Sequence, residues 1–157
     1  MRYAVLPTPL GDLLAVADPA GALVRLAFDA APPPDARRDD GAFGEASAQL
    51  AAFFGRELWA FSLSLAPAGT PFQRRVWTAL AAIPFGRTTT YGALARALGE
   101  PGAAQAVGAA NGANPLALVV PCHRVVGADG ALVGYAGGLH RKRALLNLER
   151  GQASLFA

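Results

Sequence analysis

The sequence predicts an α/β fold of the α+β kind: a small antiparallel sheet with one helix, followed by a mostly helical domain. Short apolar runs separated by turn residues fill the first 28 residues, whereas strong helix-start signals appear after residue 70. Between them, Pro67-Ala68-Gly69 marks a boundary. The 157 residues suffice for a small domain joined to a medium one, which we predict to be residues 1–66 and 67–157.

The first domain is predicted to hold strands and a helix. Turn residues separate three short apolar runs, which favours an antiparallel meander. The predicted strands are residues 3–8, 12–17 and 22–28. Residues 31–41 are rich in proline and polar side chains, so they are predicted to be a loop. A helix from Phe43 to Phe54 should end at Gly55, and residues 57–65 should return as a strand.

The second domain opens with a strong helix start. Thr70 suits the N-cap, Pro71 the first helical position, and Gln73 the third position of a capping box. One apolar face follows at helical spacing, made of Phe72, Val76, Trp77, Leu80 and Ile83. Pro84-Phe85-Gly86 then ends the helix.

Two shorter helices are predicted next. Thr90 can cap a helix from Tyr91 to Leu98, and a tight connection at residues 99–102 leads to a helix from Ala103 to Ala110. The pair resembles a helix-turn-helix, although an ordinary helical hairpin is the commoner outcome. The second of these helices has almost no long polar side chain that could read bases in the major groove. If it meets DNA, sequence-independent contact with a narrow groove is favoured.

The rest of the chain alternates extended and glycine-rich segments. Residues 116–120 are predicted to be a buried strand or extended stretch that delivers Pro121-Cys122-His123-Arg124-Val125. Residues 134–138 form a glycine-rich loop around one tyrosine. The last helix is predicted from Leu139 to Glu149.

Charge is unevenly distributed along the chain. Residues 1–66 carry five basic and eight acidic side chains, or −3, and residues 67–157 carry nine and three, or +6, which together give the net +3. A basic half is typical of a polyanion partner on one face, and a merely solvated surface explains it equally well.

The single cysteine excludes an intramolecular disulfide. With only His123 and His140 beside Cys122, no structural metal site is expected. No run reaches the roughly 18 apolar residues that a membrane helix needs, and the N-terminus lacks a secretion signal. The cytoplasm is therefore the expected location.

Cys122 followed by His123 allows two interpretations. A lone cysteine is usually a small buried hydrophobe, and from the residues alone that interpretation is favoured. As a nucleophile the thiol would need help to ionise, yet neighbours on a strand point to opposite faces. A bridging water or a backbone bend would be required, and Glu149 could orient the histidine if the last helix packs behind the cysteine.

The motif Pro-Cys-His-Arg-Val at 121–125 resembles the signature of the O6-alkylguanine-DNA alkyltransferases, also called methylated-DNA–protein-cysteine methyltransferases. The resemblance spans essentially all of 70–150 in the family's order, and residues 1–66 resemble the shorter bacterial members more loosely. The matching segments are Thr70-Pro71-Phe72-Gln73, Val76-Trp77, Ile83-Pro84, Thr88-Thr89-Thr90-Tyr91, Ala93-Leu94-Ala95, Ala106-Val107-Gly108, Asn114-Pro115, Gly134-Tyr135-Ala136-Gly137-Gly138 and Glu149.

The resemblance implies roles for five catalytic residues. Cys122 would accept the alkyl group, and His123 would deprotonate it through a water while Glu149 holds the histidine. Asn114 would stabilise the active-site turn. Tyr91 would donate a proton to the purine ring and rotate its phosphate out of the stack. The plain structural alternatives are an Asn-Pro turn and an aromatic packed on the core.

The resemblance also implies a base pocket and a DNA-binding face. Tyr135, Ala136 and Gly137, with the backbone around Val125, would hold the flipped base; the alternative is simply a flexible glycine loop. The helix at residues 103–110 would lie in the minor groove. The DNA-binding residues in and around it would be Thr90, Ala103, Ala104, Gln105, Gly108 and Asn111. Family members commonly carry arginine where this sequence has Gln105, which implies weaker base extrusion here. Arg124 is interpreted as structural.

The implied activity is direct-reversal DNA repair, in which an alkyl group moves from O6-alkylguanine, or O4-alkylthymine, to the protein's own cysteine. A thioether does not hydrolyse, so each molecule should act once, on a nucleotide flipped out of the duplex. No metal or cofactor is expected, and the partner is double-stranded alkylated DNA bound by a monomer, with cooperative binding open. The alternatives are a damage-binding module without catalysis and a cysteine hydrolase using Cys122, His123 and Glu149.

Overall fold

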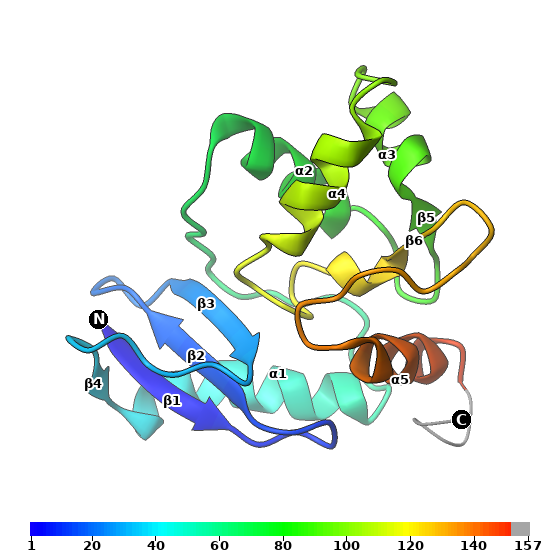
Figure 1. Cartoon of the computed structure of the whole chain (residues 1–157). Coiled ribbons are helices and arrows are strands. Elements are labelled where there is room, and N and C mark those ends of the chain that lie inside the picture. The colour runs from blue at the N-terminus through cyan, green and yellow to red at the C-terminus, as the bar shows by residue number, and fades with distance from the viewer. Residues whose placement is uncertain (152–157) are drawn as a thin grey trace. The chain divides into compact units, whose positions relative to one another are not determined.

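The computed structural model describes residues 1–151 and divides the chain into two compact units (Figure 1). The N-terminal unit comprises Met1–Ala68 with Pro115–Ala117, and the C-terminal unit comprises Gly69–Asn114 with the described residues from Leu118 onward. The predicted fold class is confirmed: a small sheet with one long helix precedes a mostly helical second half.

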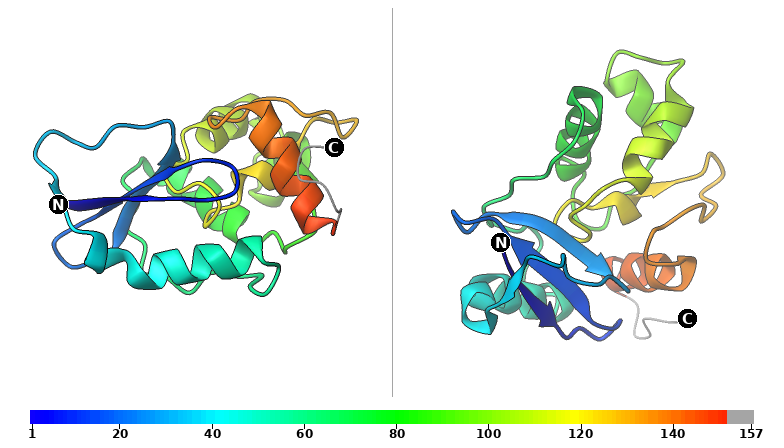
Figure 2. Two further views of the ribbon diagram at one scale, coloured as in Figure 1. Left: turned by 90° about the horizontal axis from the view of Figure 1, so that it is seen from below. Right: turned by 60° about the vertical axis from the view of Figure 1, so that its left-hand side comes forward.

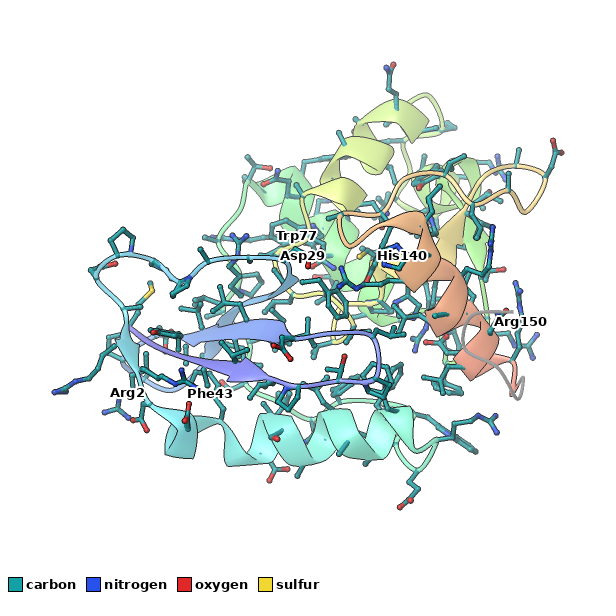
Figure 3. All side chains as sticks on the ribbon, turned by 60° about the horizontal axis from the view of Figure 1, so that its bottom comes forward. Arg2, Asp29, Phe43, Trp77, His140 and Arg150 are labelled. Atoms are coloured by element: carbon teal, nitrogen blue, oxygen red, sulfur yellow. The ribbon has the colours of Figure 1, made fainter. Side chains whose placement is uncertain are left out.

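The N-terminal unit is built on a four-stranded sheet in the order β3-β2-β1-β4. The three predicted strands are confirmed as β1 (Arg2–Leu6), β2 (Leu13–Ala17) and β3 (Leu23–Phe28), which pair in antiparallel fashion. Helix α1 (Gly44–Phe54) lies along one face of the sheet, as Figure 2 shows, and Figure 3 places Phe43 just before its first turn. Phe43, Leu50 and Phe53 are buried in this layer.

The prediction that residues 31–41 form only a loop is wrong at its C-terminal end. Arg37–Arg38 forms β4, which pairs in parallel with Arg2 and Tyr3, and Asp40–Phe43 forms the 3₁₀ helix η1. The last proline of this stretch is Pro34, so every later residue has an N–H group that can join a ladder.

Two further predicted strands are wrong. Residues 57–65 make a single bridge, Leu23 to Leu65, because Arg56 turns the chain in the left-handed region (φ 57°) and the Gln49 side chain binds the backbone N–H of Ser62 at 2.9 Å. Residues 116–120 likewise make one bridge, Leu26 to Leu116, because Leu118 has φ 73° and breaks any extended run.

The C-terminal unit begins with helix α2 (Pro71–Ala81). The predicted capping box is confirmed: Gln73 N–H donates to Thr70 Oγ1 at 3.1 Å, and Thr70 N–H donates to Gln73 Oε1 at 3.0 Å. Val76, Trp77 and Leu80 of this helix are buried, whereas the ends of the predicted face are only half-buried. Trp77 Nε1 donates to the Ala110 carbonyl at 2.9 Å.

The predicted helix-turn-helix is confirmed as α3 (Tyr91–Ala97) and α4 (Ala104–Gly112), which lie side by side in Figure 1. Thr90 caps α3 through Ala93 N–H at 3.1 Å. The strands β5 (Thr89–Thr90) and β6 (Val125–Val126) pair in parallel, which ties the start of α3 to the segment after Cys122. Helix α5 (Leu139–Glu149) has the predicted bounds.

Candidate active site and DNA-binding face

Cys122 begins a 3₁₀ helix, η2 (Cys122–Arg124), that follows the irregular segment at 116–120. Arg124 N–H closes the turn on the Pro121 carbonyl at 3.0 Å. A 3₁₀ helix has three residues per turn, so consecutive side chains diverge by about 120° and not by the 180° of a strand. This turn is the backbone bend that a cysteine and histidine adjacent in sequence require. Cys122 is 6% exposed and His123 is 0% exposed.

Glu149, the last residue of α5, joins His123 to Arg124. His123 Nε2 lies 2.6 Å from Glu149 Oε2, while Arg124 donates to both carboxylate oxygens, from Nε at 2.8 Å and from Nη2 at 3.0 Å. Gly86 N–H adds a bond at 3.2 Å. All three side chains are buried, so the carboxylate is held by four donors inside the unit.

The electrostatics of this cluster keep Glu149 ionised and His123 neutral. Burial raises the pKa of Glu149, but His123 and Arg124 outweigh it through hydrogen bonds and charge and lower the pKa to about 2. The pKa of His123 is lowered: burial is the largest cause, and the charges of Arg124 and Lys142 add to it against the opposing effect of Glu149. A neutral histidine that donates from Nε2 carries its lone pair on Nδ1, which is buried and has no hydrogen-bond partner among residues 1–151. Nδ1 is therefore the nitrogen that can take up a proton.

Acid should destabilise the protein over two pH ranges. The folded pKa of Glu149 is about 2, against an ordinary 4.5, and the folded pKa of His123 lies below its ordinary 6.5. Both groups bind fewer protons when folded, so stability falls as pH falls, first below the ordinary pKa of His123 and then below that of Glu149. The second loss is on the order of 3 kcal/mol. Urea midpoints measured across acid pH test this expectation; a profile without loss below the ordinary pKa of Glu149 would contradict it.

The Cys122 thiol is protonated at neutral pH, although several neighbouring groups favour the thiolate. Burial raises its pKa, while a hydrogen bond from the Asn114 side chain, the charge of Lys142 and backbone N–H groups oppose that rise. Asn114 Nδ2 also donates to the Val120 carbonyl at 2.7 Å, which fixes the segment that leads to the thiol. Asn111 Nδ2 lies 3.4 Å from the Cys122 carbonyl.

Of the residues predicted to hold the base, Tyr135, Ala136 and Gly137 lie on the loop between β6 and α5, and Val125 lies in β6. Tyr91 Oη donates to the Val133 carbonyl at 3.0 Å, and burial followed by the nearby Cys122 raises the pKa of Tyr91. Burial and Cys122 also raise the pKa of Tyr135 well above its ordinary value. Ala136 is exposed, Gly137 is half-buried, and Val125 is buried in β6.

Lys142 is a functional candidate that the sequence reasoning missed. It is 0% exposed, and its Nζ donates to the Val133 and Gly134 carbonyls at 3.0 and 3.1 Å. Lys142 stands between two arginines at the start of a helix, a pattern that is typical of a solvated basic cluster, so this pattern does not indicate that its side chain is buried. Its position in line with the apolar face of α5, at Leu145 and Leu146, is the signal that would have indicated burial.

Helix α4 presents small side chains on one side. Gln105, Ala106 and Ala109 are exposed, and a Cβ at Gly108 would lie 3.7 Å from the Tyr91 ring. Among the predicted DNA-binding residues, the half-buried ones are Thr90, Ala103, Ala104 and Gly108. Asn111 is 5% exposed and faces the interior, so any effect on DNA would act through the active-site backbone.

Within residues 1–151, no group of three or more His, Cys, Asp or Glu side chains is placed to hold a metal ion. In the same range, no helix combines the length and apolar character needed to cross a membrane.

Comparison with known proteins gives a consistent result. Residues 71–151 match the family model described as 6-O-methylguanine DNA methyltransferase, DNA binding domain. A methylated-DNA–protein-cysteine methyltransferase of Mycobacterium tuberculosis is 57% identical over 115 residues, which are 73% of this chain and 70% of the relative. The protein of that name from Mycolicibacterium paratuberculosis is 48% identical over 153 residues, covering 96% of this chain and 93% of the relative.

A solved structure matches over the whole chain. The crystal structure of M. tuberculosis OGT in complex with DNA superposes with a TM-score of 0.93 at 46% identity and covers 100% of both chains. The matched family model contains every residue of the Cys122, His123 and Glu149 cluster. The chain therefore belongs to the methylated-DNA–protein-cysteine methyltransferases, the family of O6-alkylguanine-DNA alkyltransferases.

Proposed function

We propose that Cys122 is the acceptor in the DNA-repair reaction of this family, and that each molecule takes one alkyl group from O6-alkylguanine in DNA. The observation that supports this most directly is the 2.6 Å contact between His123 Nε2 and Glu149, which leaves Nδ1 of a neutral histidine as the base beside a buried thiol. O4-alkylthymine has the same kind of alkyl–oxygen bond and is a second substrate.

The chemistry uses the side chains of the C-terminal unit. His123 Nδ1 takes the thiol proton through a water, and Cys122 Sγ forms a bond to the alkyl carbon as the carbon–oxygen bond breaks. The electron pair goes to the guanine, whose ring gains a proton from Tyr91. The raised pKa of Tyr91 keeps that proton available at neutral pH. Passage of a proton from His123 to Tyr91 then restores both residues, and the products are guanine and a thioether.

Irreversibility follows from the bond that forms. A thioester has a carbonyl that water can attack, whereas a thioether has none. The chain has one cysteine, so no second thiol can regenerate the first. The protein therefore acts once and needs no cofactor for the transfer.

DNA binding uses the small-residue face of α4. An alkyl group on a paired base is out of reach inside the duplex, so the nucleotide must be flipped out. The exposed side chains of Gln105, Ala106 and Ala109 suit close, sequence-independent contact in the minor groove of double-stranded DNA. Residues 67–157 would carry both binding and chemistry, with 1–66 as support. Because its thiol must stay reduced, we place the protein in the cytoplasm, working as a monomer.

Intact-protein mass tests this function. The protein is mixed with an equimolar duplex that carries one O6-methylguanine. The expected result is a gain of one methylene, located at Cys122 and stopping at one equivalent even with excess DNA. Binding without a mass change would contradict the proposal and would favour a damage-recognition module, whereas continued release of product would contradict single turnover.

Replacing Gln105 with arginine should raise the repair rate on duplex DNA. Gln105 is exposed in the first turn of α4, where a longer cationic side chain could fill the stack that the flipped base leaves. A charge-assisted hydrogen bond is worth about 1.5 to 3 kcal/mol and a neutral one about 1 kcal/mol, so the expected gain is roughly two- to thirtyfold. Single-stranded DNA carrying the same lesion is the control, since it has no partner strand. No gain in rate on the duplex, or an equal gain on duplex and single-stranded DNA, would contradict this role for the residue at position 105.

A further inference from the structure

Lys142 is a buried cation whose bonds go to backbone carbonyls. Its Nζ donates to the carbonyls of two consecutive residues, Val133 at 3.0 Å and Gly134 at 3.1 Å. Within the described part of the chain, no carboxylate pairs with it. Burying an ammonium group is costly unless it is hydrogen-bonded. The two bonds compensate for that cost and attach Lys142 to the backbone at Val133 and Gly134.

The segment that Lys142 holds is the base-pocket loop, residues 127–138, drawn in orange between β6 and α5 in Figure 1. This loop contains no helix or strand, so its course depends on such tethers. Gly134 has φ 61°, and Arg141 holds the far end of the loop through the Gly137 carbonyl at 3.1 Å. Tyr135 and Ala136 lie between the two held points.

Tyr91 binds the same carbonyl from a different helix. Its hydroxyl, at the start of α3, donates to the Val133 oxygen at 3.0 Å, so α3 and α5 both hold this one atom. After burial, the charge of Cys122 is a further cause of the raised pKa values of both Tyr91 and Tyr135, so the thiol and the two phenols influence one another electrostatically. Cys122 is only 6% exposed under this arrangement.

The two tethers differ in what happens when a base arrives. A phenol has one O–H group and can donate to one acceptor at a time. A hydroxyl that donates to the purine ring must therefore leave the Val133 carbonyl. Lys142 has no competing role and can keep its bonds.

We propose that Lys142 is a positioning residue that holds the base-pocket loop in both states, and that Tyr91 is a second tether present only before DNA binds. The inference rests on the proposed function, which brings the Tyr91 hydroxyl to the base. The Tyr91 hydroxyl then donates to the flipped base and no longer to the Val133 carbonyl. The loop thereby separates from α3 while Lys142 keeps it attached to α5. Binding of substrate thus releases one of the two tethers of the loop.

Hydrogen exchange of the loop amides tests the tethers directly. In the DNA-free protein, Lys142→Met should speed exchange of the Gly138 amide, which donates to the Tyr135 carbonyl at 2.9 Å within the loop, by about tenfold or more. Tyr91→Phe should speed it by a few-fold, since it removes one bond and Lys142→Met removes two. Arg143→Met, at an exposed neighbour, is the matched control and should change nothing. Unchanged loop exchange in both test variants would overturn the proposal.

The DNA-bound state separates the two residues. In a Cys122→Ser background, bound to an O6-methylguanine duplex that it cannot demethylate, adding Tyr91→Phe should leave loop exchange unchanged. Adding Lys142→Met should still speed it. If Tyr91→Phe still speeds hydrogen exchange of the loop in the DNA-bound protein, the proposal that Tyr91 releases Val133 when DNA binds would be overturned. This measurement can be made even if Lys142→Met fails to fold.

Iodoacetamide, which needs neither DNA nor the base pocket, measures access to the thiol. The plateau rate at high pH reports exposure of Cys122, and the pH midpoint reports its electrostatic surroundings. Lys142→Met should raise the plateau rate, because the loop loses a tether, whereas a shift in the midpoint at an unchanged plateau rate would show that Lys142 acts only as a charge and would overturn its positioning role. These readouts do not involve alkyl transfer from DNA, so they stand apart from the mass assay of the proposed function.

Discussion

Replacing Cys122 with serine is expected to abolish alkyl transfer while DNA binding is retained. Removing the nucleophile in enzymes that use one typically lowers rates by a factor on the order of 10⁴ to 10⁶. Serine keeps the shape of the side chain, and the buried site offers the hydroxyl the same Asn114 and backbone donors. No other cysteine can substitute, because the chain has only one.

The measurement is intact mass together with DNA affinity. Binding of the O6-methylguanine duplex should stay within a few-fold of the parent protein, and no methylene should be gained. Methylation of the serine variant at a rate near that of the parent would show that another residue accepts the group. Loss of binding together with transfer would instead indicate that the substitution had disturbed the fold.

Local chemistry made the helices predictable from sequence. Thr70, Pro71 and Gln73 form a capping box whose partners lie within three residues of each other, so the pattern alone fixes the helix start. Thr90 works in the same way for α3. Helix α5 also has the bounds predicted from the sequence.

Long-range bonds made the rest unpredictable. The left-handed residue Leu118 broke an apolar run that looks like a strand, and nothing in its neighbours signals a positive φ. The 3₁₀ turn at Cys122 was anticipated only as a required bend. The sequence alone indicates a surface lysine at position 142. Its bonds to Val133 and Gly134 could not be predicted, because those partners lie nine and eight residues away in an irregular loop.

The same contrast applies to Arg124, which the sequence marked only as structural. It donates to Glu149 through two nitrogens and to the Ile83 carbonyl at 2.6 Å, and its guanidinium lies 5.8 Å from the centre of the Phe85 ring. These partners are 25 and about 40 residues away along the chain. Glu149 thus binds both a structural arginine and the histidine that we propose as the catalytic base, and the two roles can be separated.

Glu149→Gln is expected to reduce both stability and repair. The substitution leaves Arg124 buried without its counter-charge, and removing one partner of a buried ion pair costs about 3 to 5 kcal/mol. It also replaces the carboxylate that orients His123 with a neutral amide. A comparable loss of charge behind a catalytic histidine slows serine proteases by about 10⁴-fold, so a fall of 10²-fold or more is expected here.

Adding Arg124→Met to Glu149→Gln distinguishes the two losses. An apolar replacement of a buried ion pair is often neutral for stability, so the double variant should regain most of the unfolding free energy. Repair should stay slow, because methionine does nothing to restore the charge opposite His123 Nε2. Urea unfolding and the rate of methylene gain are measured on the parent, both single variants and the double. If repair recovers along with stability, Glu149 acts only by holding the fold, and His123 does not depend on its carboxylate.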